Sequence, residues 1–344
     1  KLEKAWQKAL KHAPKGFNEH FLRMEWEQVI LGQGITDLNT YLYASRAGRS
    51  IQLKKSQRRE IWPFFESYMT CLLQSNVIEP EMAMWTLVNI GLKSKLECKF
   101  RSIVIDEAQD LSTAAFRLLR VLMPRQDNDL FIVGDGNQKI YSRPISLKQA
   151  GIFIQGASRA YRLRLNYRTT EEIHKTAMGV IKGQGILDLD EESDTLSYYQ
   201  SLMTGEEPKL VISASPQDRQ AELLNWISVL PAERLNELCI VARHKKTIDT
   251  YKQLLDDHKY DYYQLDQSNS ADSDQPGIRL STSHRIKGLE FSFIALVDQD
   301  SKFKAYGSNT GDSAYEEQKI KEERSLCYVA ISRARERLFV SQIE

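Results

Sequence analysis

The sequence predicts an α/β protein whose sheets are mostly parallel, and two observations carry this prediction. Two short apolar runs, residues 102–105 and 130–133, lead to an acid, the first directly to Asp106 and the second through Gly134 to Asp135, and an amphipathic stretch at 114–122 lies between them. This order predicts a parallel β-α-β unit. From residue 161 onward, apolar runs of strand length alternate with amphipathic segments of helix length. Such alternation predicts a second, mostly parallel sheet with helices on both faces.

Length and composition are those of an ordinary globular chain. Its 344 residues suffice for two or three domains, with 27% charged and 42% hydrophobic residues. No apolar run approaches the ~20 residues that span a membrane, and the polar first residues do not form a signal peptide. We therefore expect a cytoplasmic protein with no membrane partner. A net charge of +1 does not decide for or against nucleic acid, because basic residues need only cluster locally.

The four cysteines are widely spaced and form no CxxC pair. This spacing predicts reduced thiols and no zinc site. The residues are Cys71, Cys98, Cys239 and Cys327.

The first 95 residues are expected to be mostly helical. Apolar residues recur at helical spacing in segments 19–31, 38–47, 56–73 and 82–92. We expect the aromatic side chains of the third segment to pack in a core.

A basic cluster lies within this helical part. Six cations in fourteen residues could bind phosphates and would make binding sensitive to salt. The alternative is a solvated helix end, and the sequence leaves both open. The cluster comprises Arg46, Arg49, Lys54, Lys55, Arg58 and Arg59.

The elements after residue 160 are expected in a fixed order. Strand 161–168 leads to helix 170–182 and a polar loop at 183–207. Strand 209–214, helix 217–229, strand 238–243, helix 245–258 and strand 262–265 follow. A polar loop at 267–277 precedes strands 278–282 and 291–297, a mobile segment at 300–314, helix 316–335 and strand 337–342.

Asp106 and Glu107 follow the first predicted strand, at the end of a parallel sheet where ligands bind. One carboxylate there can hold Mg²⁺ together with a substrate phosphate. The other can orient or deprotonate an attacking water. The alternative is a solvated turn, because Asp-Glu pairs are common.

Five sequence blocks occur in an order that a known family shares. Residues 106–109 are Asp-Glu-Ala-Gln, and residues 134–141 are Gly-Asp-Gly-Asn-Gln-Lys-Ile-Tyr. Residues 165–168, 281–291 and 323–335 are the other three blocks. Together they resemble motifs II to VI of the UvrD/Rep/PcrA group of superfamily-one DNA helicases. The resemblance covers residues ~100 to 340 and is specific to the group rather than to one member.

The resemblance implies a fold and an activity. It implies two RecA-like parallel-sheet domains of the P-loop NTPase type, the first incomplete, with an N-terminal helical insertion. The helical subdomain would occupy residues 1–95, the rest of the first RecA-like domain 96–156, and the second domain 157–344. The implied protein is an ATP-dependent, Mg²⁺-requiring DNA helicase or translocase in repair or recombination. It would move 3′ to 5′ on single-stranded DNA or DNA with single-stranded tails.

The resemblance also assigns roles at a nucleotide site. Asp106 would hold Mg²⁺, Glu107 would activate water, and Gln138 would sense the γ-phosphate. Arg168 would reach the γ-phosphate with its planar fork of donors, and Arg333 would act as an arginine finger.

Three further residues are implied near the nucleotide. Tyr167 would stack on adenine, Glu290 would accept a hydrogen bond from the ribose, and Gly288 would permit close backbone approach. Arg335 is either a helper of Arg333 or a solvated residue.

A DNA path is implied by the same motifs. Tyr141 would stack on a base, whereas Ser281, Thr282 and His284 would contact the DNA backbone. In the family a second aromatic commonly lies two residues after the tyrosine. This chain has Arg143 there, which departs from the two-ring scheme, although a guanidinium can also stack on a base.

A P-loop, G-x-x-x-x-G-K-[ST], does not occur in the 344 residues. Its lysine and backbone amides carry much of the phosphate binding in such motors. We therefore expect a fragment of a short-form helicase, without the N-terminal motor portion, that alone hydrolyses ATP poorly. The alternative is a non-catalytic DNA- or protein-binding module derived from such a motor. A nuclease or repair partner remains an open possibility.

Overall fold

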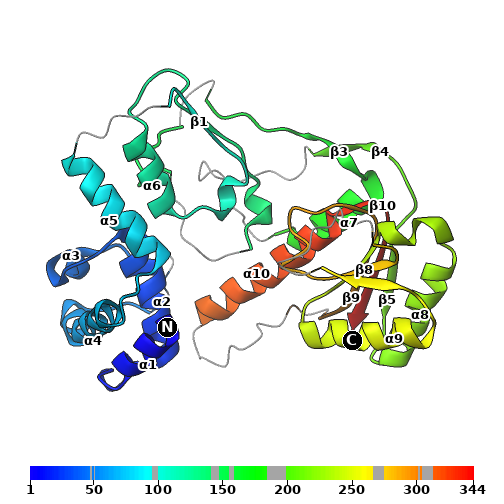
Figure 1. Ribbon diagram of the computed structural model, residues 1–344, viewed down its shortest axis with the longest axis horizontal. Coiled ribbons are helices and arrows are strands. Elements are labelled where there is room, and N and C mark those ends of the chain that lie inside the picture. The colour runs from blue at the N-terminus through cyan, green and yellow to red at the C-terminus, as the bar shows by residue number, and fades with distance from the viewer. Residues whose placement is uncertain are drawn as a thin grey trace.

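The computed structural model describes residues 1–46, 49, 51–94, 100–140, 147–154, 159–183, 199–265, 275–300, 303 and 313–344. Figure 1 shows a helical part in blue to cyan, a small sheet with its helix in blue-green, and a larger sheet in green and yellow to red. All strand pairs between these residues are parallel, which confirms the predicted α/β class. No described helix is both long and apolar enough to cross a membrane.

The helical part packs around a core of aromatic side chains. Trp6 makes edge contacts with Phe64 and Tyr68, and Trp26 stacks on Phe65. The predicted helix 19–31 is confirmed, although its last six residues form a π-helix, and the helix predicted at 38–47 ends at Tyr43. The elements are α1 (Leu2–Leu10), α2 (Glu19–Glu25), η1 (Trp26–Leu31), α3 (Leu38–Tyr43), α4 (Lys55–Gln74) and α5 (Pro80–Lys93).

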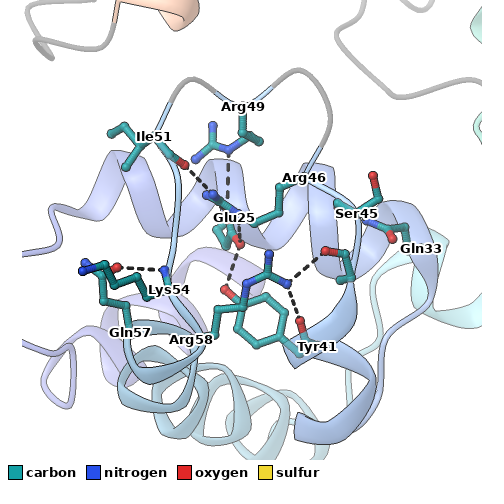
Figure 2. Close-up of polar contacts among 11 residues, drawn as sticks. Glu25, Gln33, Tyr41, Ser45, Arg46, Arg49, Ile51, Lys54, Gln57 and Arg58 are labelled. Carbon is teal, nitrogen blue, oxygen red and sulfur yellow. Dashed lines mark hydrogen bonds and ion pairs between the residues drawn. The ribbon is translucent and has the colours of Figure 1, made fainter.

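Three cations of the basic cluster are bound inside this part, as Figure 2 shows. Arg46 Nη2 lies 2.7 Å from Glu25 Oε2, and Arg49 Nε lies 3.6 Å from the same oxygen. Glu25 is fully buried and also accepts a hydrogen bond of 2.8 Å from the Tyr41 hydroxyl. Arg58 donates to the carbonyl oxygen of Tyr41 at 2.7 Å. The side chains of Arg46 and Arg49 are 6% and 5% exposed and bind a protein carboxylate, which argues against both alternatives for these two residues.

The other three cations, Lys54, Lys55 and Arg59, are exposed around the start of α4, as a solvated helix end requires. The difference between the two groups lies in Glu25. A buried carboxylate needs nearby positive charge to offset the loss of its hydration. Arg46 and Arg49 supply it, and in doing so they fix the segment between α3 and α4 to α2.

We expect Glu25→Gln to lower the free energy of unfolding by about 3–5 kcal/mol, because two guanidinium groups would remain buried without a counter-charge. Urea unfolding followed by tryptophan fluorescence measures this loss, since four of the five tryptophans lie in residues 1–94. The matched control is Glu317→Gln, which removes an exposed ion pair with Lys321 and should cost less than ~0.5 kcal/mol. A loss as small for Glu25→Gln would contradict the role assigned to it.

The small sheet carries the predicted β-α-β unit, which is confirmed. β1 (Ile103–Ile105) and β2 (Leu130–Ile132) pair in parallel, with α6 (Thr113–Leu122) between them in the chain. Ile105 packs with Phe116 of α6 on one face. The Ser112 hydroxyl accepts the Ala115 N–H and so caps α6.

The larger sheet has six parallel strands in the order β5-β10-β9-β6-β8-β7. One apolar cluster joins it to α7 and α10, and another joins it to α8 and α9, so helices cover both faces as predicted. The strands are β5 (Lys209–Ile212), β6 (Leu238–Ala242), β7 (Tyr262–Gln264), β8 (Ile278–Thr282), β9 (Phe291–Asp300) and β10 (Ala334–Ile343). The helices are α7 (Glu171–Ile181), α8 (Pro216–Ser228), α9 (Lys245–Asp257) and α10 (Ser313–Ile331).

Two predictions about this region were wrong in part. β4 (Gln200–Met203) lies inside the predicted loop 183–207 and pairs with β3 (Leu165–Thr170). The predicted helix 316–335 ends at Ile331, and β10 begins at Ala334. Arg333 therefore lies in the turn between helix and strand. Residues 184–198, 266–274 and 304–312, which include most of the predicted loops and of the mobile segment, lie outside the described residues.

Candidate functional site

The two acids at the end of β1 are exposed. Glu107 has a left-handed backbone (φ 49°), and its N–H donates to Asp106 Oδ1 at 2.8 Å. This turn presents two adjacent carboxylates to solvent. Exposed carboxylates can take part in binding a hard cation without first breaking a buried contact.

Gln109 connects these acids to the segment after β2. Its amide nitrogen donates to Glu107 Oε2, and its amide oxygen accepts the Asp135 N–H at 3.0 Å. Asp135 in turn accepts the amide of Gln138 at 2.9 Å. Gln109 is buried. Its two hydrogen bonds connect the acidic turn after β1 to the acidic turn after β2. Gln109 and Asp135 were not among the predicted site residues, although both lie within the first two sequence blocks, 106–109 and 134–141.

Gln138 also meets the larger sheet. Its amide oxygen accepts a hydrogen bond from Arg333 Nη2. Arg333 is 2% exposed, and its carbonyl accepts the Phe291 N–H at the start of β9. Burial lowers the pKa of Arg333, as does the nearby Arg168, whereas Glu107 and Glu290 oppose this. The structure thus brings together Glu107, Gln138, Arg168, Glu290 and Arg333, five of the predicted site residues.

Two contacts missed by the sequence analysis lie at the same junction. Lys287 Nζ lies 2.5 Å from Asp110 Oδ1 and 3.1 Å from the Gln138 carbonyl. Burial raises the pKa of Tyr328 on α10, and the Asp135 carboxylate beside it raises it further. Both residues lie in quoted blocks, so the signal that could have found them was their position in motifs V and VI.

Arg168 and Glu290 bind one another rather than standing apart. Arg168 Nε lies 2.6 Å from Glu290 Oε1, and both side chains are about two-fifths exposed. A ligand that takes either group must open this ion pair. Tyr167 is 69% exposed on β3, and Gly288 has φ 81°, a conformation that favours glycine.

The predicted DNA contacts are not equally accessible. Ser281 is buried in β8 and its hydroxyl donates to the Thr282 carbonyl, which argues against a side-chain contact with DNA. Thr282 is half-buried and His284 is exposed. Neighbouring protein groups displace part of the hydration of the imidazole, which lowers the pKa of His284, and the charge of Arg243 lowers it further. Tyr141 and Arg143 lie outside the described residues.

Arg335 is exposed in β10. Its charge acts on Glu237 and helps to lower the pKa of that carboxyl, after the larger effect of Arg234. The solvated alternative for Arg335 is therefore favoured over the helper.

Acidic and amide side chains that follow the strands of the small sheet contact basic side chains of the larger-sheet lobe. The protein is therefore a two-lobed α/β protein with a site between its lobes. Comparison with known families agrees. The family described as UvrD/REP helicase N-terminal domain matches residues 3–143, and UvrD-like helicase C-terminal domain matches residues 261–344. The chain belongs to the UvrD-like helicase family.

Individual relatives are distant and longer. A probable DNA helicase of Mycoplasma pneumoniae is 25% identical over 70% of this chain and 43% of its own length. The ATP-dependent DNA helicase PcrA of Staphylococcus aureus is 30% identical over 43% of this chain and 22% of its own length. The chain thus spans less than half the length of these curated relatives. A solved C-terminal domain of a possible DNA helicase from Lactobacillus plantarum aligns with 52% of the chain, with 16% sequence identity and a TM-score of 0.36.

We expect Arg333→Ala to loosen the junction between the sheets. A hydrogen bond to a charged group contributes about 1.5–3 kcal/mol, so the amides of Gln138 and Lys139 should exchange hydrogen about tenfold faster or more. Hydrogen-exchange mass spectrometry of the 344-residue chain measures this. Arg335→Ala, two positions on in the exposed face of β10, is the control and should leave that exchange unchanged. Equal exchange in both variants would show that Arg333 does not hold Gln138.

Proposed function

We propose that this chain is part of an ATP-dependent DNA helicase or translocase. The observation that carries the proposal is the contact of Gln138 with Arg333 beside Glu107. A carboxylate, an amide and a buried arginine from two different sheets converge there. This is the set of groups that phosphoryl transfer requires, since its catalysis rests on positioning and on charge stabilisation.

The residues fit a nucleotide phosphate with Mg²⁺. Arg333 Nε is buried and has no hydrogen-bond partner among the described residues, so one donor of a buried cation is available for an anion. Arg168 is close enough to lower the pKa of Arg333. Two neighbouring cations repel each other, and a phosphate between them would remove the repulsion. Asp106 and Glu107 are exposed, as acids that hold Mg²⁺ and orient water need to be.

Each residue then has one task. Asp106 would hold Mg²⁺, which would neutralise charge on the phosphates. Glu107, oriented by Gln109, would align and deprotonate the attacking water. Gln138 would hold Arg333 in position, and Arg333 would stabilise the charge that develops on the γ-phosphate. Arg168 would join it after leaving Glu290, which would then be free for the ribose.

Tyr167 and Gly288 fit the nucleotide as well. The exposed ring of Tyr167 would stack on adenine, and the left-handed Gly288 would bring the backbone close to the ligand. Both assignments belong to the proposal.

Single-stranded DNA is the proposed polymer. Thr282 is the last residue of β8 and His284 follows it, at the carboxyl end of the strand where a parallel sheet offers its binding edge. Together with Tyr141 and Arg143, they would contact backbone and bases. The finer proposal is 3′-to-5′ movement in repair or recombination, on DNA with single-stranded tails. The described cysteines Cys71, Cys239 and Cys327 are free and buried, which fits a reducing cytoplasm.

We further propose that this chain is a fragment that binds phosphate incompletely. The observation is the missing P-loop motif in a chain that spans less than half of its relatives. On this proposal, the chain alone turns over ATP poorly. The competing proposal is a non-catalytic DNA- or protein-binding module, for which the same missing motif would be a native feature.

The test is ATP hydrolysis with and without single-stranded DNA, on this chain and on the chain extended upstream to its natural start. We expect hydrolysis stimulated by DNA in the extended form only. Glu107→Gln should reduce it by about 10²-fold or more, since a general base contributes about 10²–10⁴-fold. An extended form that binds DNA but never turns over ATP would support the binding module instead.

A further inference from the structure

Lys287 joins the two sheets by a contact that the proposed chemistry does not use. Its ammonium pairs with Asp110 at 2.5 Å and donates to the Gln138 carbonyl at 3.1 Å. The Lys287 side chain is 11% exposed and that of Asp110 33%. A pair this shielded is weakened less by salt than a surface pair. Lys287 thus binds two points of the small-sheet lobe from one turn of the larger sheet.

That turn connects the proposed DNA contacts to Lys287 through a short, braced backbone. The N–H groups of Arg285 and Ile286 both donate to the Thr282 carbonyl, and the N–H of Leu289 donates to the Ile286 carbonyl. Ile286 is fully buried in the core of the larger sheet. Because the turn is hydrogen-bonded and anchored at its centre, it fixes the position of Lys287 relative to Thr282.

On the other side, Asp110 is connected directly to Glu107, the proposed general base. Residues Ala108–Asp110 form the 3₁₀ turn η2. The Asp110 N–H donates to the Glu107 carbonyl at 2.9 Å. A pull on the Asp110 carboxylate therefore acts on the backbone that positions Glu107.

We propose that Lys287 is the positioning residue that communicates DNA binding to Glu107. DNA on Thr282 and His284 sets the 283–288 turn, Lys287 holds Asp110 and the Gln138 carbonyl, and η2 then fixes Glu107. The inference rests on the proposed function, because it takes Thr282 and His284 as DNA contacts. It adds a residue that neither binds the nucleotide nor touches DNA.

Lysine suits this task for a physical reason. Its ammonium is a compact charge with three donors, so it can bind a carboxylate and a carbonyl at the same time. Methionine has a similar length but no donor, and it would leave the Asp110 charge without its partner. Lys287→Met therefore removes the contact while conserving side-chain bulk.

The test is hydrogen exchange on the 344-residue chain with and without a twenty-nucleotide oligothymidine. In the unmodified chain, DNA should slow exchange in residues 281–286 and also in 106–111. In Lys287→Met, protection of 281–286 should remain, whereas the DNA-induced protection of 106–111 should fall about fivefold or more. Asp110→Asn, a nearly isosteric change, should have the same effect, and the double variant should add nothing further.

Two controls make the outcome specific. Lys252→Met breaks an ion pair with Asp249 inside α9 and should leave the protection of both segments unchanged. Lys287→Arg keeps charge and donors, and should retain most of the coupling.

Each remaining outcome has a meaning. The inference would be overturned if DNA gave no protection of residues 106–111 in the unmodified chain, or if that protection were unchanged in Lys287→Met. Either result would leave the proposed function intact. Failure of the unmodified chain to bind the oligothymidine would contradict the proposed function, and the inference with it.

Discussion

The side-chain amide of Gln138 is hydrogen-bonded on both sides, and it links the small-sheet lobe directly to Arg333. Its nitrogen donates to Asp135, and its oxygen accepts from Arg333. Only an amide of this length offers both a donor and an acceptor here. A glutamate would accept from Arg333 but repel Asp135, and a lysine would do the reverse. The position of Arg333 relative to Glu107 thus depends on a neutral side chain between an acid and a base.

Helix α10 extends the reach of this junction to the helical part. It has 19 residues and is therefore about 28 Å long. Gln318 near its start accepts a hydrogen bond from Gln28 of the π-helix at 3.2 Å, and Arg333 lies just past its end. Figure 1 shows α10 running from the helical part to the larger sheet. π-helices often occur at functional sites. Here the π-helix η1 places Gln28 against α10, the helix that leads to Arg333.

Local patterns predicted the strands, helices and motif turns well, because apolar periodicity fixes which residues are buried. They failed where distant contacts decide. Arg46 looked like a phosphate ligand because its partner, Glu25, lies 21 residues away on another helix. The helix predicted to 335 ends at Ile331, because Ala334 pairs with Phe291 of β9 and this pairing overrides the helical propensity of Ala and Arg. β4 was missed since its four residues, with only Leu202 and Met203 apolar and both exposed, give no clear strand pattern.

The charges at the junction favour the binding of an anion there. A buried guanidinium with an unpartnered Nε is costly, and Arg168 nearby adds repulsion that lowers the pKa of Arg333. Glu107 and Glu290 offset this only in part, because Glu290 is already paired with Arg168. A phosphate would satisfy Arg333 and attract Arg168 away from Glu290. Without a phosphate, Arg168 stays with Glu290 and the repulsion between the two arginines remains, so these charges favour an anion at the junction.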